Sequence, residues 1–69
     1  MDEKLTAFFG SNAKMVGDYF AKAPAGPERD ARMSRATKAA ETNDRKARKD
    51  VVNLAAYWLA RWERFGAVC

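Results

Sequence analysis

The sequence of 69 residues contains no histidine and only one cysteine, Cys69. A single thiol excludes a disulfide within the chain, and the absence of histidine excludes the Cys/His cage of a structural zinc site. We therefore expect no metal and no cofactor, and we expect a chain this small to gain stability by forming oligomers. A lone thiol is also typical of a protein from a reducing compartment.

Groups that carry out catalysis are equally scarce. Ser11 and Ser34 are the only serines, and no glycine-rich phosphate loop is present. Several carboxylates stand four residues before a base, as Glu28 does before Arg32, and this is the spacing of ion pairs on a solvated helix face. The sequence therefore predicts a protein that is not an enzyme.

No long apolar run is present either. The longest uncharged stretch that is rich in apolar residues, 51–60, is about half as long as a membrane span. The first four residues hold more acids than bases, unlike the basic start of a secretory signal. We expect a cytoplasmic protein that does not contact membranes.

Proline and glycine are few, and they mark one turn. Pro24 ends a first helix because the residue before a proline is pushed out of the helical region, and Pro27 suits the first position of the next helix. No alternating strand pattern is present, and Gly66 is a natural helix cap. The sequence therefore predicts an all-α fold in one domain, 1–69, with a helix at about 3–22, a turn at 23–27 and a long helix at about 28–65. Gly10, Ser11 and Asn12 are also a turn signal, so a first helix that begins at Ser11 or Asn12 is the alternative.

An apolar stripe defines the second helix, since its members stand three or four residues apart, the spacing of one helix face. The stripe consists of Met33, Ala36, Ala40, Asn43, Ala47, Val51, Leu54, Trp58, Trp62 and Phe65. It crosses Thr42, Asn43 and Asp44 without a change of phase, which favours one continuous helix. Each of these three residues is also a favourable N-cap. A break there, giving a three-helix bundle, is the alternative fold.

The two predicted helices differ in length. At 1.5 Å per residue the second is nearly twice as long as the first, which spans roughly 30 Å, so the first covers only half of it. The large apolar residues beyond that reach need other cover, because each one left in water forgoes about 1.5–3 kcal/mol. We therefore predict a two-helix hairpin that forms a homodimeric four-helix arrangement. The predicted dimer core consists of Val51, Leu54, Trp58, Trp62 and Phe65.

The net charge of +4 is concentrated in one segment, since residues 28–50 hold eight bases and five acids. On a helical wheel, five of these bases gather opposite the apolar stripe, and such a face suits the phosphate backbone of a nucleic acid. They are Arg35, Lys38, Arg45, Lys46 and Lys49. A small dimeric DNA-binding regulator that uses this face is therefore the alternative function.

Two groups of residues are candidates for contact with a protein partner. Tyr57, Arg61 and Arg64 flank the tryptophans at helical spacing, and tyrosine and arginine are enriched at binding hot spots. An apolar edge of the first helix also suits a partner's helix or groove, and it is formed by Phe8, Met15 and Tyr19. Our leading hypothesis is a non-catalytic protein that binds a larger protein, for example one of a host, and modulates or inhibits its activity. We expect such a protein among the accessory proteins of phages or mobile elements.

Overall fold

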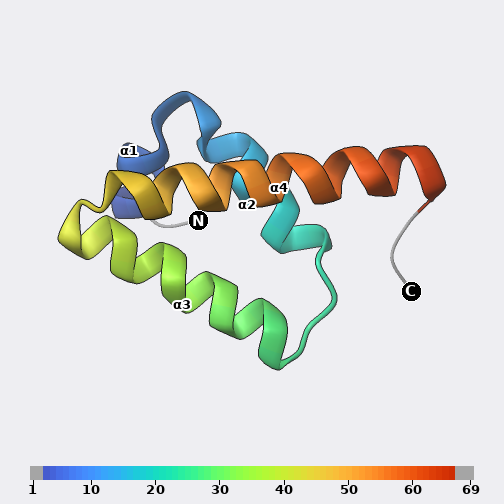
Figure 1. Ribbon diagram of the computed structural model, residues 1–69, viewed down its shortest axis with the longest axis horizontal. Coiled ribbons are helices and arrows are strands. Elements are labelled where there is room, and N and C mark those ends of the chain that lie inside the picture. The colour runs from blue at the N-terminus through green and yellow to red at the C-terminus, as the bar shows by residue number, and fades with distance from the viewer. Residues whose placement is uncertain (1–2, 67–69) are drawn as a thin grey trace.

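The computed structural model describes residues 3–66, and every regular element in that range is helical (Figure 1). The elements are α1 (Glu3–Phe9), the 3-10 turn η1 (Gly10–Asn12), α2 (Ala13–Lys22), α3 (Pro27–Thr42) and α4 (Arg45–Phe65). The prediction of an all-α fold is confirmed. Cys69, the lone thiol, lies outside the described residues.

The segment predicted as one helix over 3–22 is divided by η1. Gly10 has a φ of +57°, a left-handed conformation that glycine adopts without steric cost. The chain changes direction at this residue, so α1 and α2 pack against each other instead of forming one straight helix. Both short helices then contribute side chains to the same core.

The predicted continuous helix over 28–65 is wrong, because the chain breaks at Asn43. This residue is left-handed (φ 54°, ψ 44°), and the amide of Asp44 donates to the carbonyl of Ala39 at 2.9 Å, which closes α3 with a Schellman-type cap. The Asp44 side chain accepts a hydrogen bond from the amide of Ala47 at 3.0 Å and caps α4. The two caps end one helix and begin the next, even though the apolar stripe keeps its helical spacing across this point. The alternative of three helical segments (α1–α2, α3 and α4) is the observed one.

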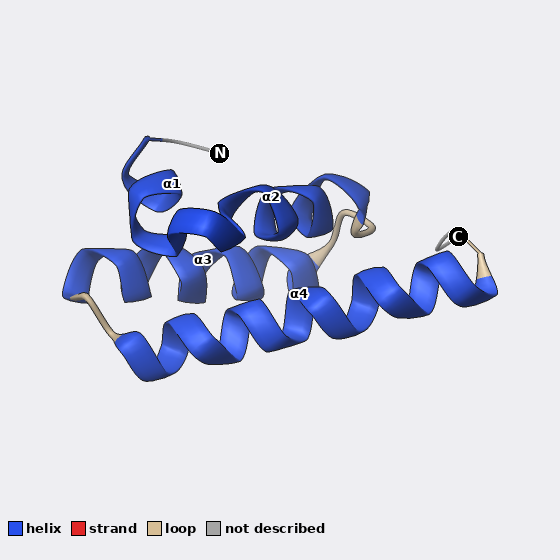
Figure 2. Ribbon diagram, turned by 90° about the horizontal axis from the view of Figure 1, so that it is seen from above, coloured by secondary structure: helices blue, strands red, loops and turns tan. Residues whose placement is uncertain are grey.

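The helices α3 and α4 diverge from this turn as the two arms of a V, and α1 and α2 lie across one face of the V (Figures 1 and 2). The core lies between α1–α2 and the two arms. Its buried members are Phe9, Ala13, Val16, Tyr19, Phe20, Ala23, Ala36, Val51 and Ala55. Large side chains from α1 and α2 therefore meet alanines on α3 and α4, and this match of sizes allows close packing.

The position of α4 alongside α2 changes how its apolar residues are covered. Val51 is 5% exposed, and Leu54, Trp58 and Trp62 pack partly buried against the core of their own chain. The expectation that these four lie beyond the reach of their own chain is wrong, because the α3–α4 turn brings α4 back to α2. Phe65 differs, since it is 72% exposed. The homodimer and its four-helix arrangement stay predictions.

Candidate binding site

The C-terminal end of α4 extends past the other helices (Figures 1 and 2). Tyr57 and Phe65 are 57% and 72% exposed there, and they are two of the three large hydrophobic side chains that are exposed among residues 3–66. The guanidinium carbons of Arg61 and Arg64 lie 5.5 and 5.9 Å from the centre of the Phe65 ring. We call these four residues, Tyr57, Arg61, Arg64 and Phe65, the α4 tip.

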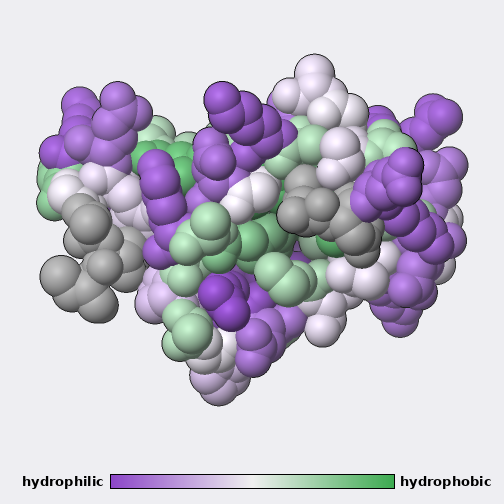
Figure 3. Space-filling view, turned by 180° about the vertical axis from the view of Figure 1, so that it is seen from behind, coloured by the Kyte–Doolittle hydropathy of each residue, from purple (hydrophilic) through white to green (hydrophobic). Residues whose placement is uncertain are grey.

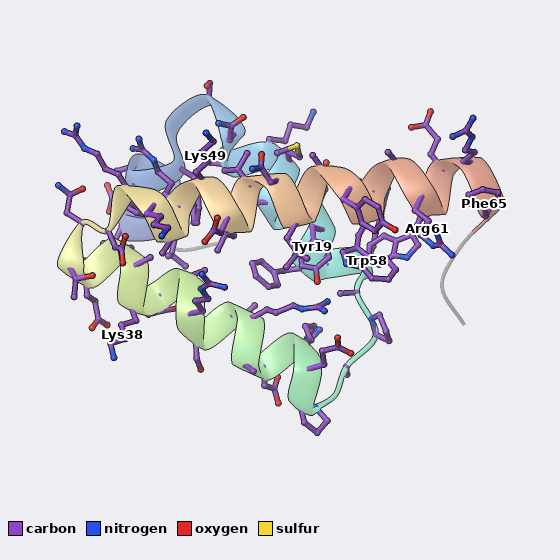
Figure 4. All side chains as sticks on the ribbon, in the orientation of Figure 1. Tyr19, Lys38, Lys49, Trp58, Arg61 and Phe65 are labelled. Atoms are coloured by element: carbon purple, nitrogen blue, oxygen red, sulfur yellow. The ribbon has the colours of Figure 1, made fainter. Side chains whose placement is uncertain are left out.

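Helix spacing builds the α4 tip. Its members stand at i, i+4, i+7 and i+8, so they share one side of the last turns of α4. Together with Ala60 they line a shallow hollow of about 280 Å³. The structure thus places the predicted partner contacts Tyr57, Arg61 and Arg64 on one surface. It adds Phe65, which the sequence assigned to a dimer core (Figure 4).

The α4 tip carries positive charge that the described residues 3–66 leave without an ion-pair partner. Among residues 3–66, neither Arg61 nor Arg64 forms an ion pair. Their guanidinium groups are attracted to the ring of Phe65 instead, an interaction that is weak where both groups stay in water. The surface therefore presents one phenyl ring and two positive charges to solvent.

The predicted edge of the first helix is largely used inside the chain. Tyr19 is 1% exposed, so its assignment as a partner contact is wrong. Phe8 and Met15 pack partly buried against the core, and the guanidinium carbon of Arg48 lies 5.6 Å from the centre of the Phe8 ring. On the rear face of the molecule, apolar side chains gather near the centre and hydrophilic side chains surround them (Figure 3). Phe8 and Met15 are therefore less exposed than Tyr57 and Phe65 of the α4 tip.

The five predicted nucleic-acid contacts do not share one helix, because the break places them on two. They are Arg35 and Lys38 on α3, and Arg45, Lys46 and Lys49 on α4, and all five are exposed. Lys38 extends from α3 away from α4, whereas Lys49 lies on the side of α4 that faces away from α3 (Figure 4). Arg35 donates to a carboxylate oxygen of Asp50 at 2.9 Å and so joins α3 to α4. The single basic face expected from a continuous helix is therefore divided.

Tyr19 connects all three helical segments (Figure 4). Its ring stacks on Trp62 of α4, with the centroids 5.6 Å apart and the planes at 2°. Its hydroxyl accepts a hydrogen bond from Nη1 of Arg32 on α3 at 2.7 Å. Arg32 also pairs with Glu28, and its guanidinium carbon lies 6.0 Å from the centre of the Trp58 ring. One arginine therefore faces a hydroxyl, a carboxylate and an indole at the same place.

A cavity of about 240 Å³ lies beside this contact, between the end of α2, the start of α3 and the second half of α4. We call it the tryptophan cavity, and its lining residues are Tyr19, Ala23, Pro24, Glu28, Arg29, Arg32, Trp58 and Trp62. The Nε of Arg29 and the Nε1 of Trp62 are buried and have no hydrogen-bond partner among residues 3–66. The sequence did not predict this cavity, because it forms only where the break brings α4 back to α2.

Within residues 3–66, no three side chains of histidine, cysteine, aspartate or glutamate form a group that could hold a metal ion. None of the described helices has both the length and the apolar character needed to cross a membrane. Comparisons with protein-family models, with curated proteins and with solved structures found no match to this chain.

Proposed function

We propose that this chain is a non-catalytic binding protein that docks onto a larger protein through the α4 tip and modulates or inhibits that protein. One observation supports the proposal above the others. Phe65 is 72% exposed at the end of a protruding helix, and the guanidinium groups of Arg61 and Arg64 lie within 6 Å of its ring.

The composition of the α4 tip suits a binding surface. Burying a phenylalanine that is otherwise in water contributes about 1.5–3 kcal/mol, which is large for a contact by one side chain. Tyrosine and arginine, which make up the rest of the tip, are among the residues most enriched at hot spots. A protruding helix end can also enter a groove on a partner, a common mode of recognition.

The charges of the α4 tip indicate the chemistry of the partner surface. Glu63 is the only acid between residues 57 and 65, and Arg61 and Arg64 lack ion-pair partners among residues 3–66. An apolar pocket bordered by carboxylates would bury Phe65 and pair both arginines. We therefore infer an acidic protein surface as the occupant.

The test is capture of the partner from an extract of the source organism, with and without nuclease treatment, by the tagged chain and its variants. The informative variants are Phe65→Ala and the double charge reversal Arg61→Glu/Arg64→Glu. Met33→Ala is the matched apolar control, since Met33 is the other exposed large hydrophobic residue of the described chain, at 40%. Arg45→Glu/Lys46→Glu is the matched charge control.

Support for the proposal requires one protein that wild type and both controls recover in a constant ratio and both tip variants lose. The purified protein must also bind the chain directly. Recovery that depends on nucleic acid would instead favour the DNA-binding alternative. Sedimentation of the chain at micromolar concentration tests whether a second copy of the chain binds to the α4 tip. If the wild-type chain has a mass of twice 7.7 kDa and Phe65→Ala halves it, the α4 tip binds a second copy of the chain. This result would overturn the proposal that the tip docks onto a different protein.

A further inference from the structure

The tryptophan cavity shares no residue with the α4 tip, and the proposed function leaves it unexplained. Its volume of about 240 Å³ lies just under the 300–1,000 Å³ of sites for drug-sized ligands. The occupant it admits is therefore small, about one ring with a short substituent.

One side of the cavity is aromatic. The rings of Trp58 and Trp62 lie 6.0 Å apart at 37°, and Trp62 is held in place by its stack on Tyr19. Flat aromatic surfaces favour a flat apolar group that stacks or meets them edge to face. The aliphatic members Ala23 and Pro24 extend this apolar lining.

Two donors at the cavity lack an acceptor among residues 3–66. Both buried atoms without a partner, Nε of Arg29 and Nε1 of Trp62, are N–H groups that can only donate. A buried donor without a partner is destabilising, and such atoms are rare in folded proteins. Both residues line this one cavity. The missing component is therefore an acceptor, and a carboxylate supplies two acceptor oxygens. Each of the two nitrogen atoms exposes less than 1 Å² to solvent, so its pairing with an acceptor in the cavity requires a small shift of its side chain.

The charge balance favours an anion as well. Arg32 already donates to the hydroxyl of Tyr19 and to the carboxylate of Glu28. Arg29 forms no ion pair among residues 3–66, so its positive charge is the uncompensated one at the cavity. Pairing of a guanidinium with a carboxylate is charge-assisted, and it is stronger than pairing with a neutral acceptor.

We infer that the tryptophan cavity binds a small aromatic carboxylate. The ring lies against Trp58, and the carboxylate accepts from Arg29 and from the indole of Trp62. The cavity and the α4 tip use different residues, and the two surfaces are neighbours, since the rings of Trp58 and Tyr57 lie 5.4 Å apart.

The test is a titration of the isotope-labelled chain with phenylacetate, followed through the indole N–H signals by NMR. The sequence holds only two tryptophans, Trp58 and Trp62, and both line the cavity, so both signals report on it. We expect a saturable shift of the Trp62 signal, with a Kd on the order of 1 mM for so small a probe. Acetate tests whether binding requires the aromatic ring, and 2-phenylethanol tests whether binding requires the negative charge.

Arg29→Met keeps an apolar stem of similar length and removes the donor. We expect Arg29→Met to lower the affinity for phenylacetate at least tenfold. Arg61→Met on the α4 tip should leave this affinity unchanged. Circular dichroism confirms that each variant is folded. The inference is overturned if phenylacetate gives no saturable shift, if 2-phenylethanol binds equally well, or if folded Arg29→Met binds as wild type does.

Discussion

The ring of Tyr19 lies parallel to the indole of Trp62, with a plane angle of 2° and a centroid distance of 5.6 Å. This contact joins α2 to the second half of α4, the part of the chain expected from the sequence to depend on another subunit for cover. The hydroxyl of the same tyrosine accepts from Arg32 on α3. A single buried side chain therefore connects the three helical segments.

Substitutions at Tyr19 separate the ring from its hydroxyl. Tyr19→Phe should lower the free energy of unfolding by about 1–2 kcal/mol, because it removes a hydrogen bond to a charged group that is itself partly exposed. Tyr19→Ala should lower it by about 3–5 kcal/mol, the range for deletion of a buried aromatic ring. Urea denaturation followed by circular dichroism measures both. Wild-type stability of Tyr19→Ala would show that the stack on Trp62 does not hold α4.

The left-handed conformation of Asn43 gives a matched pair of variants. Asn43→Gly should keep stability or raise it by up to about 1 kcal/mol, because glycine adopts positive φ without strain. Asn43→Leu should lower stability by about 1–2 kcal/mol, the cost of a left-handed conformation for a residue with a β-carbon. Thermal unfolding ranks the pair. A leucine variant more stable than the glycine variant would mean that α3 and α4 form one helix.

The cap at Asp44 can be tested by its acceptor oxygen. Asp44→Ala should lower stability by about 0.5–2 kcal/mol, because the amide of Ala47 loses its partner. For a domain of this size, 1 kcal/mol corresponds to a fall in Tm of about 4–8 °C. Asp44→Asn keeps an acceptor and should retain most of the stability. An equal loss in both variants would assign the effect to the charge and not to the cap.

Much of the fold could be predicted from the sequence, because its signals are local. Pro24 and Pro27 mark the observed α2–α3 turn, and Gly66 follows the observed end of α4. The break at Asn43 could not be decided, because the apolar stripe keeps its phase through the break. A continuous helix and a capped break both fit that pattern. The choice depends on the caps around Asp44 and on the core that α4 reaches once the chain turns back.

The binding surfaces also divide into features that the sequence predicts and features that depend on the fold. The spacing of Tyr57, Arg61 and Arg64 is a property of one helix, so the sequence alone predicts that they share a surface. The burial of Tyr19 and the tryptophan cavity depend on contacts between helices that are distant in the chain. The position of Phe65 beside the arginines was also missed, because the sequence assigned this residue to an apolar core.

Titration calorimetry of the purified partner with wild type, Phe65→Ala and Met33→Ala tests docking through the α4 tip most directly. Phe65 is 72% exposed, so its truncation should change the free energy of unfolding by no more than about 0.5 kcal/mol. It should nevertheless weaken binding by about 30-fold or more, which corresponds to the 2 kcal/mol of a hot spot. Met33→Ala should leave the Kd within about twofold of wild type, as expected for a side chain outside the interface. Equal affinity of the wild type and Phe65→Ala would contradict docking through the α4 tip.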